Sequence, residues 1–84
     1  MKISGYEGRH NTSGERIRMA REKAGLSQSQ LAARLQVKGI GINQKAISRI
    51  ETGERIVTDY ELACLIESLQ VVPLWLLLGD KENS

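Results

Sequence analysis

Apolar residues recur three and four positions apart along most of the chain, with polar residues between them. This is the periodicity of helices that bury one face, and it predicts an all-α fold. Signals that start and stop helices divide the pattern into five segments. The predicted helices are 13–24, 28–35 with a continuation as far as 38, 44–51, 59–69 and 73–78.

Capping residues set these boundaries. A Ser or Thr followed three residues later by Glu or Gln forms a capping box, which satisfies backbone N–H groups at a helix start. The candidate boxes are Thr12 with Glu15, Ser27 with Gln30, and Thr58 with Glu61. Asn43 is the expected N-cap of 44–51, and Pro73 suits the first turn of 73–78. The expected helix-ending glycines are Gly25, Gly39 and Gly53.

The core is expected to be aliphatic, because the chain has no Phe, one Trp and two Tyr. The apolar helix positions are Ile17, Met19, Ala20, Ala24, Leu31, Ala32, Leu35, Val37, Ala46, Ile47, Ile50, Leu62, Ala63, Leu65, Ile66 and Leu69. Cys64 lies among them and is expected to be an inert core thiol. Ile40 and Ile42, between two predicted helices, are expected to pack inward.

The 84 residues fit one small domain. We expect this domain to span 12–79, preceded by a flexible arm (1–11) and followed by a polar tail (80–84). His10 lies in the arm and is expected to have no role.

Charge is distributed unevenly along the chain. Residues 1–55 carry 11 Lys and Arg against 5 Asp and Glu, whereas 56–84 carry 1 against 5. The basic part favours an anionic partner such as nucleic acid, and the acidic part is expected to face something else. Ordinary surface charge is the alternative explanation.

Several classes of protein do not fit the composition. One Cys and one His cannot assemble a Cys/His metal site within one chain. No nucleophile with a base and no obvious pair of catalytic carboxylates is present, so we expect no enzyme, no cofactor and no small-molecule effector. No stretch approaches the roughly 18 apolar residues of a membrane span, and no secretory leader is evident. A cytoplasmic location is expected.

Helices 28–38 and 44–51, joined by a glycine-containing turn, form a candidate helix-turn-helix. The outward face of 44–51 is polar, as a helix entering the DNA major groove requires. Gln44 can pair with adenine, and Lys45 or Arg49 with guanine. Ser48 is small enough to let the helix sit deep in the groove.

Two positions outside this helix are candidate phosphate contacts. Gln28 begins the helix 28–38, where backbone amides can bind an anion. The helix 44–51 is the predicted recognition helix, the one that enters the major groove. Arg55 follows it closely enough to reach the DNA backbone.

Two strings in the chain carry a family resemblance. Gly25–Ala32 (GLSQSQLA) and Ile47–Arg55 (ISRIETGER), found together in this order, resemble the phage-repressor (Cro/repressor, Xre-type) helix-turn-helix family. The stretch 74–79 is similar to the closing helix of that family, so the resemblance covers about 12–79. It implies a five-helix lambda-repressor-like domain, usually a dimer that reads a palindromic operator.

The resemblance also assigns residue roles and shows one departure. It gives Gln28 a phosphate contact and places the base-reading face on the recognition helix. Members of the family usually place about three residues between the last core residue of the second helix and the recognition helix, whereas here 38–42 separate Val37 from Asn43. Either the second helix is longer or the turn bulges. The lengthened turn offers Lys38 and its glycine amides as further phosphate contacts.

The predicted sites are therefore as follows. The DNA-binding residues are Gln28, Lys38, Asn43, Gln44, Lys45, Ser48, Arg49 and Arg55. The dimer interface comprises Ile56, Val57, Tyr60 and Trp75, with a core position as the alternative for Trp75. Glu51 is expected to form a structural pair with a basic residue such as Arg18. The alternative role of Arg49 is an exposed ion pair with carboxylates near Glu51.

The sequence predicts a sequence-specific double-stranded DNA-binding transcriptional regulator, a repressor that acts as a homodimer on a palindromic operator. The alternative is a protein-interaction module of the same fold, such as an antitoxin or an adapter that binds its partner through 59–69. An affinity for duplex DNA that falls as the salt concentration rises distinguishes the DNA-binding regulator from the protein-interaction module.

Overall fold

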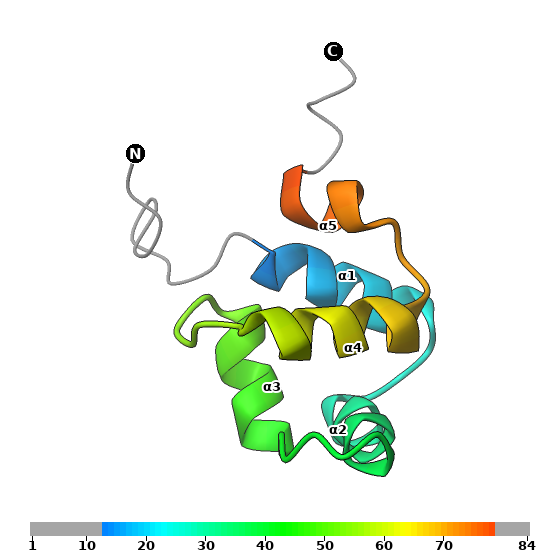
Figure 1. The fold of residues 1–84 in the computed structure, drawn as a ribbon, viewed down its shortest axis with the longest axis vertical. Helices are drawn as coiled ribbons and strands as arrows, with labels where there is room; N and C mark the ends of the chain where they lie inside the picture. Colours follow the sequence, from blue (N-terminus) through cyan, green and yellow to red (C-terminus); the bar gives the residue numbers. More distant parts are fainter. Residues whose placement is uncertain (1–12, 79–84) are drawn as a thin grey trace.

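The computed structural model describes residues 13–78, which are helical apart from short connections (Figure 1). Along the chain the helices are α1 (Gly14–Lys23), α2 (Gln28–Val37), α3 (Gln44–Glu51), α4 (Asp59–Leu69) and α5 (Pro73–Leu78). The all-α expectation is confirmed for this part of the chain.

Side-chain caps begin α2, α3 and α4 as the sequence predicts. Ser27 Oγ accepts from the Gln30 amide at 3.0 Å, and Gln30 Oε1 accepts from the Ser27 amide at 2.8 Å. Thr58 and Glu61 form the same reciprocal pair at the start of α4. Asn43 Oδ1 accepts from the Ala46 amide at 2.9 Å. These bonds satisfy backbone donors that a helix start leaves without intrahelical partners.

The start of α1 differs from the prediction. Ser13 is its N-cap, because the Ser13 carbonyl accepts the first helical hydrogen bond from the Ile17 amide at 2.8 Å. The Ser13 side chain makes no capping hydrogen bond. Thr12, the predicted N-cap, lies outside the described residues. The helix therefore begins one residue later than its capping pattern indicated.

Helix ends follow the glycine signals in three cases. Gly25, Gly39 and Gly53 follow α1, α2 and α3 with φ of +75°, +88° and +83°, a left-handed conformation that suits glycine. At the end of α4, Gln70 adopts this conformation instead, with φ of +56°. The sequence offered no glycine there to mark the end.

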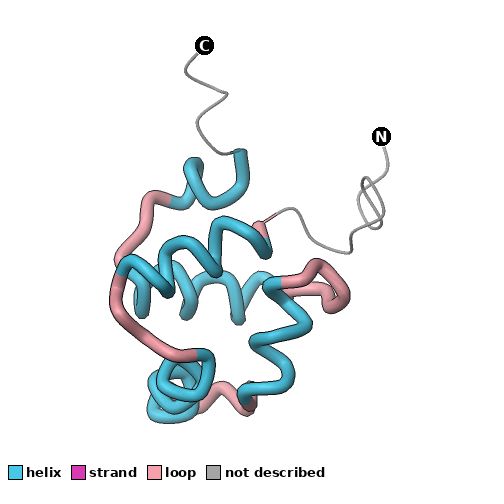
Figure 2. The backbone as a smooth tube through the Cα atoms, turned by 180° about the vertical axis from the view of Figure 1, so that it is seen from behind, coloured by secondary structure: helices cyan, strands magenta, loops and turns pink. Residues whose placement is uncertain are grey.

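The helices lie in a simple spatial order. α1 and α4 lie side by side in the middle, α3 and α2 lie at one end, and α5 covers the opposite end (Figure 1). The reverse view shows the same order, with α2 and α3 joined by a short loop at the lower edge (Figure 2). The side chains that fill the centre completely are Ile17, Leu31, Leu35, Ile42, Ile47, Ile50, Leu65 and Leu76.

Four expected core positions are exposed instead. Met19, Val37 and Ala63 each lie two positions from a fully buried residue, which places them on the opposite side of their helices. Val37, expected as the last core residue of α2, is 88% exposed. Ala24 is the C-cap of α1 and is also exposed.

The connection between α2 and α3 is anchored by its two isoleucines. Ile40 and Ile42 are buried, as predicted. The Ile40 amide donates to the Leu35 carbonyl at 2.9 Å, and Gln36 Nε2 donates to the Ile42 carbonyl at 3.3 Å. These contacts hold the start of α3 against the end of α2.

A side-chain hydrogen bond connects the first helix to α5. Arg16 Nε donates to the Leu76 carbonyl at 2.7 Å, while the Leu76 side chain is fully buried. Trp75 packs against the core and stays partly exposed. No helix within residues 13–78 is both long and apolar enough to cross a membrane.

Candidate nucleic-acid interface

α3 presents one apolar face and one polar face. Ile47 and Ile50 are fully buried against the other helices. The outward positions are Gln44, Lys45 and Arg49, which are exposed, and Ser48, which is partly exposed. The four predicted base-reading residues therefore share the solvent-facing side of one short helix. Donors and acceptors on such a face can reach base edges in a major groove.

A chain of hydrogen bonds runs from the protein interior to the first residue of α3. Arg21 donates to both carboxylate oxygens of Glu51, from Nε at 2.6 Å and from Nη2 at 3.1 Å. Gln28 Nε2 donates to Glu51 Oε1 at 3.0 Å. Gln44 Nε2 in turn donates to Gln28 Oε1 at 2.6 Å. The exposed amide of Gln44 is thus tied through the Gln28 side chain to a buried ion pair.

The buried part of this chain joins α1 to α3 and to the connection before α2. Arg21 of α1 is 9% exposed and Glu51 of α3 is 5% exposed. Arg21 Nη1 also donates to the Leu26 carbonyl at 2.7 Å, just before α2. The hydrogen bond to Glu51 raises the pKa of the Arg21 guanidinium, so the cation is held in its charged form.

The prediction that Glu51 pairs with a residue such as Arg18 was wrong about the residue. Arg18, the expected partner, lies on the outside of α1 and pairs with Glu22 at 3.1 Å. Arg21 occupies the inward side, three residues further along the same helix. Gln28 was predicted as a phosphate contact, and the structure adds an internal role that its position at the start of α2 did not indicate. The phosphate contact itself stays a prediction.

Arg55, predicted to contact phosphate, pairs with Glu61 in the first turn of α4. Its Nη1 and Nη2 donate to the two carboxylate oxygens of Glu61 at 2.9 and 3.0 Å. The Arg55 guanidinium is the main reason that the pKa of Glu61 lies below its usual value. The same carboxylate completes the capping box with Thr58. Arg55 therefore fixes the α3–α4 connection to α4.

Lys38 also has a carboxylate partner on α4. Its Nζ lies 2.8 Å from Glu67 Oε1, and this contact holds the pKa of Glu67 below its usual value. Glu67 is largely exposed, so solvent screens the pair and its effect on stability is small. A phosphate at Lys38 would have to compete with Glu67. The predicted DNA contact of Lys38 remains untested.

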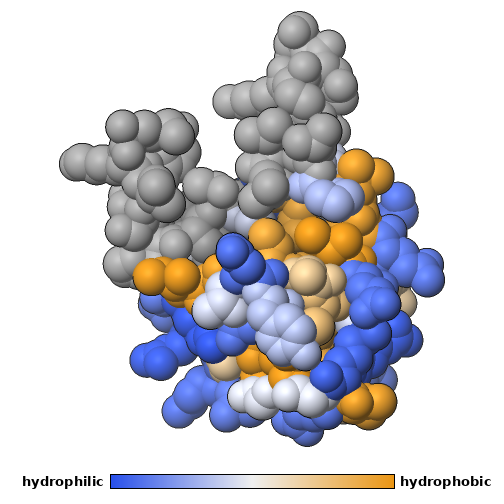
Figure 3. Space-filling model, viewed as in Figure 1, coloured by the Kyte–Doolittle hydropathy of each residue, from blue (hydrophilic) through white to orange (hydrophobic). Residues whose placement is uncertain are grey.

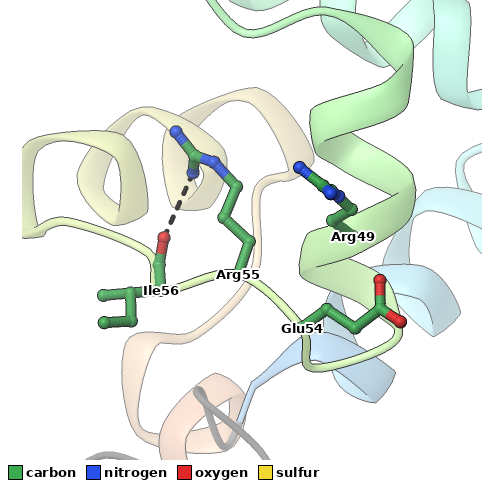
Figure 4. A pocket seen from close by; sticks show the side chains of 4 residues that line it. All are labelled: Arg49, Glu54, Arg55 and Ile56. Carbon is green, nitrogen blue, oxygen red and sulfur yellow. Dashed lines mark hydrogen bonds between the residues drawn. The ribbon is translucent and has the colours of Figure 1, made fainter.

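An open groove of about 420 Å³ lies beside the last turn of α3. Its walls are Arg49 of α3 and Glu54, Arg55 and Ile56 of the following connection (Figure 4). Arg49 forms no ion pair with any of the residues 13–78, so its predicted structural alternative is not realised there. The groove thus brings together one arginine from the last turn of the predicted recognition helix and one from the connection that follows it.

The four predicted dimer residues differ in exposure. Ile56 is 57% exposed and Tyr60 is 65% exposed, whereas Val57 and Trp75 pack partly against the core. In the view of Figure 3, the end that holds α2 and α3 carries many hydrophilic residues with apolar patches between them. Val72, just before α5, adds an exposed apolar side chain that the sequence pattern did not single out.

Sequence reasoning left three charged residues of this region unassigned, the buried Arg21 and the exposed Glu54 and Glu67. The partners of Arg21 and Glu67 depend on which side of each helix faces a neighbour. Only Arg21 left a signal, since it lies four residues after Ile17 on the buried face of α1. Among residues 13–78, no three potential metal ligands come together.

Stability should depend on pH through Glu61. Its pKa is lowered on folding, so the carboxylate favours the folded state above its unfolded pKa of about 4.3. This contribution is lost as the pH falls through the lower pKa of the folded protein. Glu61→Gln keeps the capping box and removes the charge, and it should cost about 1 kcal/mol at pH 7.

The measurement is urea unfolding of both proteins between pH 7 and pH 3. The difference between wild type and Glu61→Gln should shrink to nothing in acid. Glu67→Gln, which removes the exposed partner of Lys38, is the matched control and should change stability very little. A cost for Glu61→Gln that stays constant over this pH range would contradict the assigned role.

Known proteins match both the sequence and the fold. The helix-turn-helix domain family matches residues 14–73. The HTH-type transcriptional regulator DicA of Escherichia coli (strain K12) is 34% identical over 77 residues, which cover 92% of this chain and 53% of DicA. The HTH-type transcriptional regulator for conjugative element R391 of Providencia rettgeri is 38% identical over 71 residues, covering 84% of this chain and 30% of that regulator.

A solved structure gives the same result. The P22 c2 repressor protein, crystallised in complex with synthetic operator 9T, superposes with a TM-score of 0.69 at 34% identity. The match covers 83% of this chain and 98% of the repressor chain. The chain spans about half the length of DicA and a smaller part of the R391 regulator. The chain belongs to the helix-turn-helix domain family, and within that family to the Xre-type phage-repressor group.

Proposed function

We propose that this protein is a transcriptional regulator that binds double-stranded DNA in a sequence-specific manner and acts as a repressor. The observation that carries the proposal is the polar face of α3, whose first residue is tied through Gln28 to the buried Glu51. The similarity to a repressor crystallised with its operator supports it. α3 is the recognition helix in this proposal and lies in the major groove.

Each side chain of this face has a distinct proposed role. Gln44 reads adenine, and Lys45 and Arg49 donate to guanine. Ser48 permits close approach and contacts base or phosphate. Asn43, at the start of α3, lies close to the DNA while its Oδ1 caps the helix.

The proposed backbone contacts flank the recognition helix. Gln28 and Arg55 bind phosphates on the two sides of the groove. The lengthened connection 38–42 brings Lys38 to a further phosphate, for which it must leave Glu67. The DNA-binding unit comprises 12–79 in a five-helix lambda-repressor-like arrangement, acts in the cytoplasm and uses no cofactor.

We further propose that the protein binds a palindromic operator as a homodimer. One recognition helix reads only a few base pairs, and two half-sites about one helical turn apart supply the remaining specificity. Ile56 and Tyr60 provide exposed apolar surface for the partner, and the partly exposed Val57 and Trp75 adjoin the core. Aromatic side chains such as Tyr60 and Trp75 are more common at interfaces than on the rest of a protein surface.

The direct test of base reading uses Arg49→Ala on a duplex selected from a random library by the purified protein. Loss of a bidentate guanine contact should weaken binding by about 1–3 kcal/mol and relax the preference at one base position. Fluorescence anisotropy gives the affinity, and a repeated selection gives the preference. Arg18→Ala removes an equal charge from α1 and should have a much smaller effect.

Unchanged affinity and unchanged base preference in Arg49→Ala would contradict the assigned reading face. Binding of wild type to the selected duplex should also fall linearly in log salt as phosphate counterions are released. If wild type binds no duplex at any salt concentration, the proposed function is wrong.

Dimer formation is tested by sedimentation velocity with and without the selected duplex. Ile56→Asp places a charge in the proposed interface and should weaken self-association at least about tenfold, equivalent to about 1.4 kcal/mol. Val37→Asp is the matched control, because Val37 is an exposed apolar residue of α2. A wild-type protein that is monomeric at every concentration, free and DNA-bound, would refute the dimer.

A further inference from the structure

Glu54 is the carboxylate of the groove beside the last turn of α3. It shares this groove with Arg49 and Arg55, which come from α3 and from the same connection (Figure 4). Its side chain is exposed. If α3 enters a major groove, this carboxylate lies on the side of the protein that approaches the phosphate backbone.

The neighbouring arginines do not neutralise Glu54. Arg55 directs its guanidinium to Glu61, with both carboxylate oxygens of Glu61 accepting. Glu54 forms no ion pair with any residue of the part of the chain that the structure describes, and neither does Arg49. Within residues 13–78, no cation is therefore in direct contact with the negative charge of Glu54.

The backbone keeps Glu54 at this place. The Arg49 carbonyl accepts from the Glu54 amide at 2.8 Å and from the Arg55 amide at 3.2 Å. Gly53, with its left-handed backbone, makes the turn that allows both bonds. The main chain at Glu54 cannot move away from the end of α3 without losing these bonds.

The fold does not benefit from a carboxylate here. The C-terminal end of a helix carries a partial negative charge, which favours a nearby cation over an anion. Glu54 follows the C-terminal end of α3 closely, is exposed and makes no ion pair within 13–78. Its effect is therefore expected outside the protein, on the charged surface that comes to this groove.

We infer that Glu54 is an affinity-setting residue, which repels duplex phosphates at the Arg49–Arg55 groove and weakens binding to DNA of any sequence. This inference rests on the proposed function. Binding that is independent of sequence is almost entirely electrostatic, so a single unbalanced charge beside the phosphates acts on it directly. The effect is to limit occupation of non-operator DNA.

The test measures affinity for a labelled duplex of random sequence by fluorescence anisotropy. At about 0.15 M salt, Glu54→Gln should raise this affinity about two- to fivefold, as expected for one charge several ångströms from a phosphate in a water-like medium. Glu54→Lys should raise it further and steepen the log–log salt dependence by about 0.9. Circular dichroism establishes that each variant is folded.

The matched control is Glu15→Gln, which removes an equal charge from the first turn of α1. It should change the affinity much less, because Glu15 does not line the groove. An equal gain in Glu15→Gln would mean that net charge alone is responsible, and it would overturn the inference.

Two further outcomes would overturn the inference about Glu54. Unchanged affinity in both Glu54 variants would show that phosphates do not approach this groove. Weaker binding of Glu54→Gln to the selected duplex alone would show that Glu54 accepts from a base, such as cytosine N4. Salt-dependent duplex binding by wild type separates these failures from failure of the proposed function, which would remove binding to every duplex.

Discussion

The buried ion pair between Arg21 and Glu51 is the interaction on which the position of the proposed reading face depends. It connects α1 to the last residue of α3, and Gln28 connects the same carboxylate to the start of α2. Removal of one partner of a buried pair typically costs about 3–5 kcal/mol, because the other charge is left uncompensated. Such a pair need not stabilise the fold more than apolar residues would. Its geometric effect is to fix three helices relative to one another and, through Gln28, to orient Gln44.

The acidic and basic parts of the chain pair with each other in the structure, although the sequence suggested two separate surfaces. The acidic residues of 56–84 suggested a separate surface for another partner. Two of them, Glu61 and Glu67, instead return to Arg55 and Lys38 in the basic part. α4 thereby holds the connections on both sides of α3, and the exposed cations of the α3 face itself are Lys45 and Arg49.

Local chemistry made much of the fold predictable. The capping boxes at Ser27 and Thr58 and the Asn43 cap fixed the starts of α2, α4 and α3, because each acts within four residues. Pairs of side chains that are far apart in the sequence were harder to predict. Arg18 and Arg21 are equivalent in type, and only the rotation of α1 decides which one meets Glu51. Val37 was wrongly predicted to lie in the core, because only the rotation of α2 decides which of its apolar residues face inward. The polar face of α3 followed from periodicity, whereas the bond from Gln28 to Gln44 needed the packing of α2 on α3.

In the proposed function, the chain of hydrogen bonds that ends at Gln44 positions a base-reading side chain. A double-mutant cycle on duplex affinity with Gln28→Ala, Gln44→Ala and the combined variant tests this claim most directly. We expect a coupling of about 0.5–1.5 kcal/mol on the selected duplex, since Gln28 orients the amide that reads the base. On a random duplex the coupling should vanish. Additive effects on the selected duplex, or no loss of affinity in Gln44→Ala, would contradict it.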